Sequence, residues 1–120
     1  MIGFQRRFDP AFAALKARVE AGEIGDPEML VITSRDPGAP PVEYIKHSGG
    51  IFKDMLIHDF DIFRWMLDDE AGTLHATGSC RWTWRLRKRV ISIRRLSRSA
   101  PNAAALCQIN TTRRAAYGYD

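Results

Sequence analysis

Three ionisable side chains, Asp54, His58 and Asp61, lie within the short stretch DMLIHDFD. Their spacing of four and then three residues places them along one face of a helix. An imidazole beside a carboxylate can act as a general acid or base near neutral pH, and the carboxylate can fix its tautomer. General acid–base chemistry is therefore one interpretation. A solvated surface pair and a metal site built on these side chains are the alternatives.

A helix must position these groups, and the sequence predicts one over roughly residues 51–67, after Ser48-Gly49-Gly50. Apolar residues recur there at helical spacing beside the ionisable face. These residues are Ile51, Phe52, Met55, Leu56, Ile62 and Met66.

The rest of the chain predicts one further helix and several strands. Asp9 can cap a helix that begins with Pro10, and Gly22 suits its end. A loop rich in Pro and Gly is expected over residues 36–41. Strands are expected over residues 29–33, 73–80, 104–110 and 115–119. Helix, strand, helix and then several strands indicate an α+β domain with a mostly antiparallel sheet.

Length and composition indicate one ordinary domain. The chain has 120 residues, of which 45% are hydrophobic. No apolar run approaches the roughly 20 residues that a membrane span needs, and the first residues do not resemble a signal peptide. We expect a soluble, cytoplasmic protein with no membrane partner. Cys80 and Cys107 have no metal-binding spacing and are expected to be buried free thiols.

A basic segment distorts the overall charge. The chain carries 18 basic and 14 acidic residues, but eight of the basic ones lie between Arg81 and Arg98, where no acidic residue occurs. The rest of the chain therefore has a net charge of −4. One interpretation is a nucleic-acid patch, because Trp82 and Trp84 alternate with arginines. Another is an alternating strand, in which Trp82, Trp84 and Leu86 share a face.

A third interpretation of residues 81–102 is a compensated shift of reading frame. Codons permitted for this segment, read after dropping the first two bases, give VDLAIAQAGDIDTAVVSL. That product is a loop with Gly-Asp followed by an apolar strand, which would lead into the predicted strand at 104–110. We prefer this interpretation and expect no nucleic-acid partner. The encoded segment would place Arg94 and Arg95 in mid-strand, where a charge facing the core is costly, so we expect poor stability.

The chain has no G-x-G-x-x-G turn. A dinucleotide-binding fold uses that turn to bring a helix N-terminus to the pyrophosphate. We therefore expect that these 120 residues alone do not bind NAD by that fold.

Several motifs resemble the inositol dehydrogenases of the Gfo/Idh/MocA family of NAD(P)-dependent oxidoreductases. The stretch GFQRRFD at residues 3–9 resembles the family's G-F-x-R-R-[FY]-D, and SRDP at 34–37 resembles its substrate-side turn. The most specific motif is SGGIFKDMLIHDFD at 48–61, which resembles the family's signature helix. ALCQIN at 105–110 and YGYD at 117–120 resemble the strands that follow. The resemblance covers residues 1–80 and about 103–120, and the basic segment matches nothing in it.

The resemblance implies that residues 1–120 are a partial C-terminal substrate-binding domain, with an incomplete open-faced sheet and helices on one face. It makes Asp54 and His58 the catalytic pair, and the reaction the oxidation of a cyclic polyol, such as myo-inositol, to a ketone with NAD⁺. The family's N-terminal Rossmann domain, its Glu-Lys-Pro motif and that motif's catalytic lysine are absent here. The parent protein is expected to form a homo-oligomer, a tetramer. Another sugar or cyclitol dehydrogenase and a non-catalytic assembly module remain alternatives. Residues expected to line the polyol pocket are Gln5, Arg6, Ser34, Asp36 and Tyr119.

Overall fold

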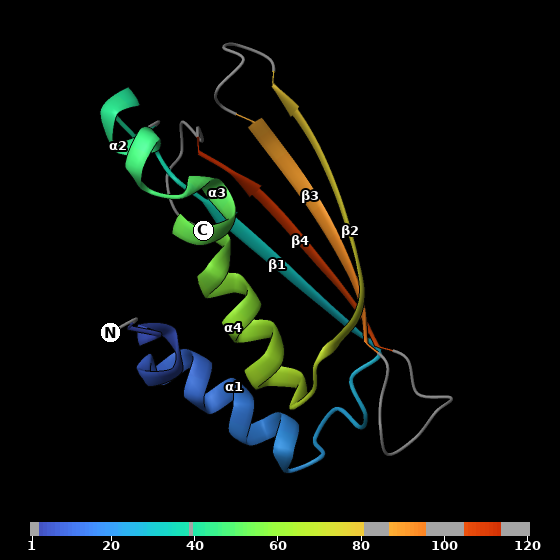
Figure 1. Ribbon diagram of the computed structural model, residues 1–120. Coiled ribbons are helices and arrows are strands. Elements are labelled where there is room, and N and C mark those ends of the chain that lie inside the picture. Colours follow the sequence, from blue (N-terminus) through green and yellow to red (C-terminus); the bar gives the residue numbers. More distant parts are fainter. Residues whose placement is uncertain (1–2, 39, 81–86, 96–104, 114–120) are drawn as a thin grey trace.

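The computed structural model describes residues 3–38, 40–80, 87–95 and 105–113, with the backbone alone for residues 79–80, 87–92 and 94–95. Its elements are a short 3-10 helix, four α-helices and four strands (Figure 1). In chain order they are η1 (Gln5–Phe8), α1 (Pro10–Glu20), β1 (Met29–Arg35), α2 (Val42–His47), α3 (Gly50–Asp54), α4 (Leu56–Leu67), β2 (Ala71–Cys80), β3 (Arg87–Arg95) and β4 (Leu106–Thr112).

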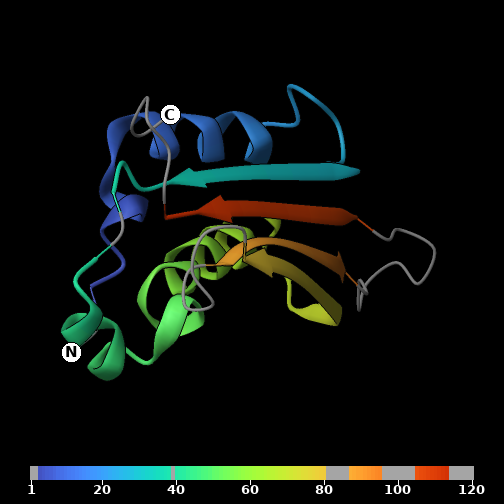
Figure 2. The same cartoon turned by 90° about the horizontal axis from the view of Figure 1, so that it is seen from above.

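The four strands form one sheet in the order β1-β4-β3-β2 (Figure 2). β1 runs parallel to β4, with Met29 opposite Leu106. The β4–β3 and β3–β2 pairs are antiparallel, and Ile93 of β3 lies opposite Cys107 on one side and Leu74 on the other. Two of the three pairings are antiparallel, as the sequence predicted. The strand expected over residues 115–119 lies outside the described residues.

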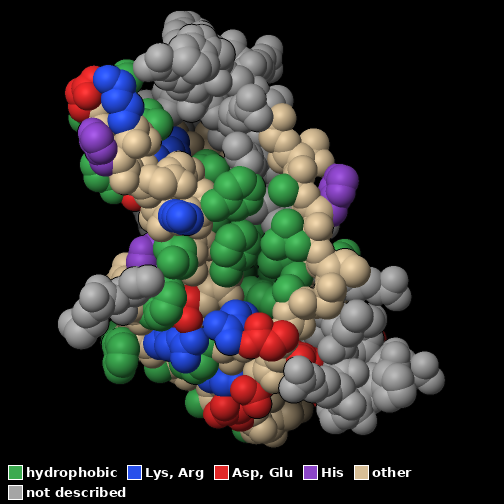
Figure 3. Space-filling model, viewed as in Figure 1, with side chains coloured by type: hydrophobic (Ala, Val, Ile, Leu, Met, Phe, Trp, Pro, Cys, Tyr) green, Lys and Arg blue, Asp and Glu red, His purple; other side chains and the backbone are tan. Residues whose placement is uncertain are grey.

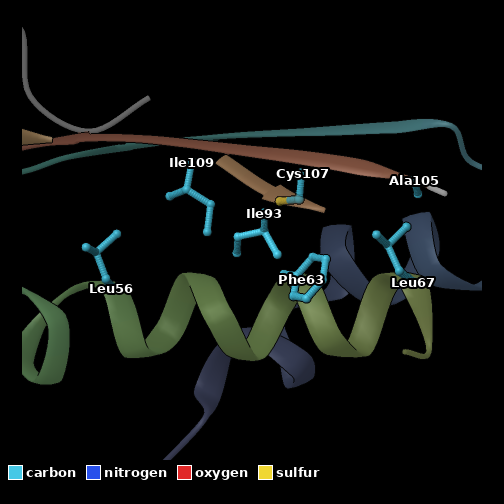
Figure 4. Close-up of a cluster of buried hydrophobic side chains, with 7 residues drawn as sticks. All are labelled: Leu56, Phe63, Leu67, Ile93, Ala105, Cys107 and Ile109. Atoms are coloured by element: carbon cyan, nitrogen blue, oxygen red, sulfur yellow. The ribbon is translucent and has the colours of Figure 1, made fainter. Parts of the chain in front are cut away.

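The core lies between α4 and one face of the sheet (Figure 4). Leu56, Phe63 and Leu67 point from α4 toward the strands, and all are at most 6% exposed. Cys107 and Ile109 of β4 point toward the helix and are fully buried. The alternation of a strand explains this, because every second residue of β4 faces the same side.

The opposite face of the sheet is open among the described residues. Met29 is 60% exposed, Val31 is 52% exposed and Leu106 is 39% exposed. These side chains alternate with the inward-facing positions of β1 and β4. The observed fold is therefore α+β, with α4 covering one face of a small sheet.

The helix predicted over residues 51–67 is two helices. Met55 separates them, with φ −110° and ψ −55°. Consecutive side chains on a regular helix point about 100° apart, yet Met55 and Leu56 are both buried. Leu56 packs in the core, whereas Met55 accepts a hydrogen bond at Sδ from the Thr111 hydroxyl, at 3.1 Å. The break lets both neighbours point inward, so the prediction of one continuous helix was wrong.

The first predicted helix is confirmed. The Asp9 carboxylate accepts hydrogen bonds from the backbone N–H groups of Ala11 and Phe12, Pro10 is the first helical residue, and Gly22 follows with φ +74°. The short helix α2 was not predicted. Glu43 in its first turn and Lys46 in its last turn are favourably placed for the helix dipole.

Part of the basic segment forms β3, which pairs with β2 and β4. Ile93 is 1% exposed and belongs to the core. The strand ends at Arg95, so Arg94 and Arg95 lie at its end. They are the last two described residues of the strand, and residues 96–104 lie outside the described part of the chain. The face shared by Trp82, Trp84 and Leu86 lies outside the described residues.

Candidate active site

A pocket of about 350 Å³ brings together six of the residues predicted to form the site. It lies where η1, the end of β1, the α3–α4 junction and the end of β4 meet. Tyr119, the seventh, lies outside the described residues. The residues brought together are Gln5, Arg6, Ser34, Asp36, Asp54 and His58.

Two polar pocket residues, Tyr44 and Arg113, were not predicted. Tyr44 lies on α2, the helix that the sequence analysis missed. Arg113 follows the last residue of β4 and is only 8% exposed. The polar run Thr111-Thr112-Arg113 directly after a predicted apolar strand was the available signal, because polar side chains at a strand end often belong to a site.

Both carboxylate oxygens of Asp54 are engaged. The Tyr44 hydroxyl donates a hydrogen bond to Oδ1 at 2.5 Å. Arg113 donates to Oδ2 through a terminal nitrogen, and the Asp54 side chain is 16% exposed. A carboxylate with charge-assisted partners on both oxygens has a fixed orientation. The Nδ1 atom of His58 has no hydrogen-bond partner, so Asp54 does not orient the imidazole through that atom.

His58 presents an imidazole whose Nδ1 atom is buried without a hydrogen-bond partner. The ring meets Phe4 edge to face, with 6.2 Å between centroids and an interplanar angle of 83°. Phe4 therefore limits the orientation of the ring without occupying its nitrogens. The ring belongs to the first turn of α4, just beyond the break at Met55.

Asp59, the residue after His58, lies behind the pocket and pairs with Arg6, which lines it. Its side chain is fully buried and accepts a hydrogen bond from Arg6 at Oδ1. Ser34 Oγ and Asp59 Oδ2 are both buried without a partner, although the hydroxyl is close enough to lower the pKa of the carboxyl. Burial raises the pKa of Asp59, and this outweighs the opposing effects of Arg6, Ser34 and His58. Sequence reasoning did not single out Asp59.

Asp61 lies apart from the pocket, so the prediction that it shares the ionisable face with Asp54 and His58 was wrong. It accepts two hydrogen bonds from Arg7, at 2.8 and 2.5 Å, and is 4% exposed. The break at Met55 places Asp54 on α3, whereas His58 and Asp61 both belong to α4, and the Asp61 carboxylate is engaged by Arg7. Among the described residues, no three His, Cys, Asp or Glu side chains are grouped in a way that could hold a metal ion.

The surface over α1 and α4 carries basic and acidic side chains next to one another, and apolar side chains gather between α4 and β2 (Figure 3). Exposed ion pairs join Arg64 to Glu70 and Arg18 to Glu23. Within the part of the chain that is described, no helix is long and apolar enough to cross a membrane.

Comparisons with known proteins agree with this architecture. The inositol 2-dehydrogenase of Rhizobium meliloti strain 1021 is 46% identical over 127 aligned positions, which cover 100% of this chain and 36% of the relative. The scyllo-inositol 2-dehydrogenase (NAD(+)) of Bacillus subtilis strain 168 is 54% identical over 77 positions, covering 65% of this chain and 22% of the relative.

Among solved structures, the myo-inositol dehydrogenase of Lactobacillus casei in complex with NAD(H) and myo-inositol superposes with a TM-score of 0.78 at 25% identity. That match covers 100% of this chain and 34% of the other. This chain thus spans about a third, or less, of the length of these relatives. The sequence model of the GFO/IDH/MocA C-terminal domain matches residues 12–120, and the chain belongs to the Gfo/Idh/MocA family through that domain.

Proposed function

We propose that this chain supplies the polyol-binding and proton-accepting part of an inositol dehydrogenase, which oxidises one secondary hydroxyl of a cyclic polyol to a ketone. The observation that carries the proposal is the pocket, because the described residues expected at the family's site line one cavity. Polar groups dominate that cavity, as recognition of a molecule with many hydroxyls requires. Relatives named for myo- and scyllo-inositol support the substrate class.

In this proposal His58 accepts the hydroxyl proton. Its imidazole lines the pocket, and a general base must lie within hydrogen-bond reach of the proton that it accepts. Asp54 keeps a negative charge on the pocket wall, in an orientation fixed by Tyr44 and Arg113. That charge favours the imidazolium that forms when His58 takes the proton.

The described residues do not fit a dinucleotide. The sequence contains no G-x-G-x-x-G turn, and the parallel pair β1–β4 is not built as a phosphate-binding strand–turn–helix unit. NAD⁺ is the proposed hydride acceptor of the whole enzyme, and we assign its binding to no residue of this chain.

A chimeric enzyme, called the transplant enzyme below, tests the proposal. Residues 1–120 replace the aligned segment of the Rhizobium meliloti inositol 2-dehydrogenase, and NADH formation is followed with myo-inositol and scyllo-inositol. We expect turnover with at least one of them, and kcat about 10²–10⁴-fold lower for His58→Ala, the usual contribution of general acid–base catalysis. The 120-residue chain alone should form no NADH above a heat-killed control.

His75→Ala is the matched control, because His75 is an exposed histidine on β2 that does not line the pocket. It should leave turnover within about twofold of the parent, as surface changes usually do. Near-normal turnover of His58→Ala would refute the proposal. Turnover that depends on an added divalent metal would replace it with the metal-site interpretation.

The open face of the sheet supports a further part of the proposal, that the parent protein is a homo-oligomer. Exposed Met29, Val31 and Leu106 lie on that face, and apolar side chains exposed together commonly mark a subunit contact. Val31→Lys should shift the transplant enzyme to a smaller species in light scattering if the tetramer uses this face. An unchanged mass would contradict it.

A further inference from the structure

Arg113 has hydrogen-bonding capacity that the protein itself does not use. The residue is 8% exposed and lines the pocket. One terminal nitrogen donates to Asp54, but the Nε–H group is buried without a partner. An unpaired buried donor is costly, and a charged one especially so.

The neighbouring acid does not complete the bonding. Asp36 Oδ2 lies 3.8 Å from Arg113 Nε, which is too long for a hydrogen bond. Asp36 also lines the pocket, and its side chain is 36% exposed. Arg113 and Asp36 thus both line the pocket, and their unbonded donor and acceptor atoms lie close together. A hydroxyl group, which both donates and accepts, can bridge such a pair.

We propose that Arg113 is a specificity-determining substrate contact, which donates from Nε to one hydroxyl of the bound polyol while Asp36 accepts from the same hydroxyl. This inference rests on the proposed function, since it names a contact within the same pocket. It also explains how one guanidinium can both hold Asp54 and select the substrate, because its N–H groups point in fixed and different directions.

A panel of ligands isolates this contact. The full 120-residue chain is titrated by NMR with myo-inositol and with each of its mono-deoxy analogues. One analogue should bind the parent chain at least about tenfold more weakly, the usual loss for a hydrogen bond to a charged group. In Arg113→Lys that particular penalty should vanish, whereas the penalties for the other analogues should persist. Lys keeps the positive charge beside Asp54 but lacks the separate Nε–H donor of the arginine guanidinium.

Arg113→Met serves as a second variant, and the same panel measured as KM in the transplant enzyme serves as a second readout. Arg64→Met is the control, since Arg64 forms an exposed ion pair with Glu70 away from the pocket, and it should keep the parental pattern. A parental pattern in Arg113→Lys overturns this inference alone. A parent chain and transplant that recognise no inositol overturn the proposed function, and the inference with it.

Discussion

Replacing Ile93 tests whether the basic segment really completes the core. Ile93 is 1% exposed and packs in the cluster that includes Leu56 and Phe63. Truncating a buried Ile to Ala typically costs about 2–5 kcal/mol, from lost transfer free energy and the cavity left behind. The milder change Ile93→Val should cost about 0.5–1.5 kcal/mol. Many small domains are stable by only about 5–15 kcal/mol, so the larger change removes a substantial part of the total.

Urea unfolding followed by circular dichroism measures the effect. With a slope of about 1–3 kcal/mol per molar for small proteins, Ile93→Ala should lower the midpoint by roughly 1–2 M, or abolish the folded baseline. Ile24→Ala is the matched control, because Ile24 is 67% exposed and should change stability by less than about 0.5 kcal/mol. If Ile93→Ala and Ile24→Ala unfold at the same urea concentration, β3 does not pack as described, and the reasoning from the core is refuted.

Three other predictions follow from the buried groups and the gene. Folding raises the pKa of Asp59, so the stability that this group contributes is present below its ordinary pKa and is lost as pH rises through the raised folded value. Asp59→Asn should therefore lower the free energy of unfolding less at pH 7 than at pH 4. The reverse order in urea unfolding would show that the pairing with Arg6 dominates. Burial raises the pKa of the Cys107 thiol to about 12, so its alkylation at pH 8 should be about a thousandfold slower in the folded than in the unfolded chain, as read by mass spectrometry of the peptide 99–113. The codons for residues 81–102, shifted in frame, should encode an apolar strand, and stop codons in both alternative frames would exclude the frameshift.

Local signals in the sequence predicted the elements well where one residue type decides the conformation. The Asp9 cap and Pro10 fixed the start of α1 through hydrogen bonds that form within three residues. The strand expected over residues 104–110 corresponds to β4, whose buried positions Cys107 and Ile109 follow the period of a strand. The break at Met55 could not be predicted in this way. It accompanies contacts of Met55 with Thr111, 56 residues away in the chain, and of Leu56 with the core.

The residues of the candidate site also differ in whether the sequence alone could predict them. Asp54 and His58 could be found from their spacing, and the family motifs pointed to Arg6, Ser34 and Asp36. The pairings of these residues could not, because Arg113 and Asp59 form them between distant segments, although the polar run after the last predicted strand was a signal for Arg113 itself. Arg113 reaches Asp54 across 59 positions, and Arg6 reaches Asp59 across 53. A helical pattern also grouped Asp61 with Asp54 and His58, but Asp61 pairs with Arg7 and does not line the pocket.

The basic segment shows how a composition signal and a packing signal can conflict. Eight positive charges without an acid between Arg81 and Arg98 argue against a buried strand, yet β3 contributes an apolar side chain to the core. Ile93 provides it, opposite Cys107. A shifted frame would place another apolar residue near the same position, since the recovered sequence DTAVVSL is itself strand-forming. The fold thus constrains this segment to be a strand with an apolar side chain facing α4, and the nucleotide sequence decides which residues carry that role in the parent gene.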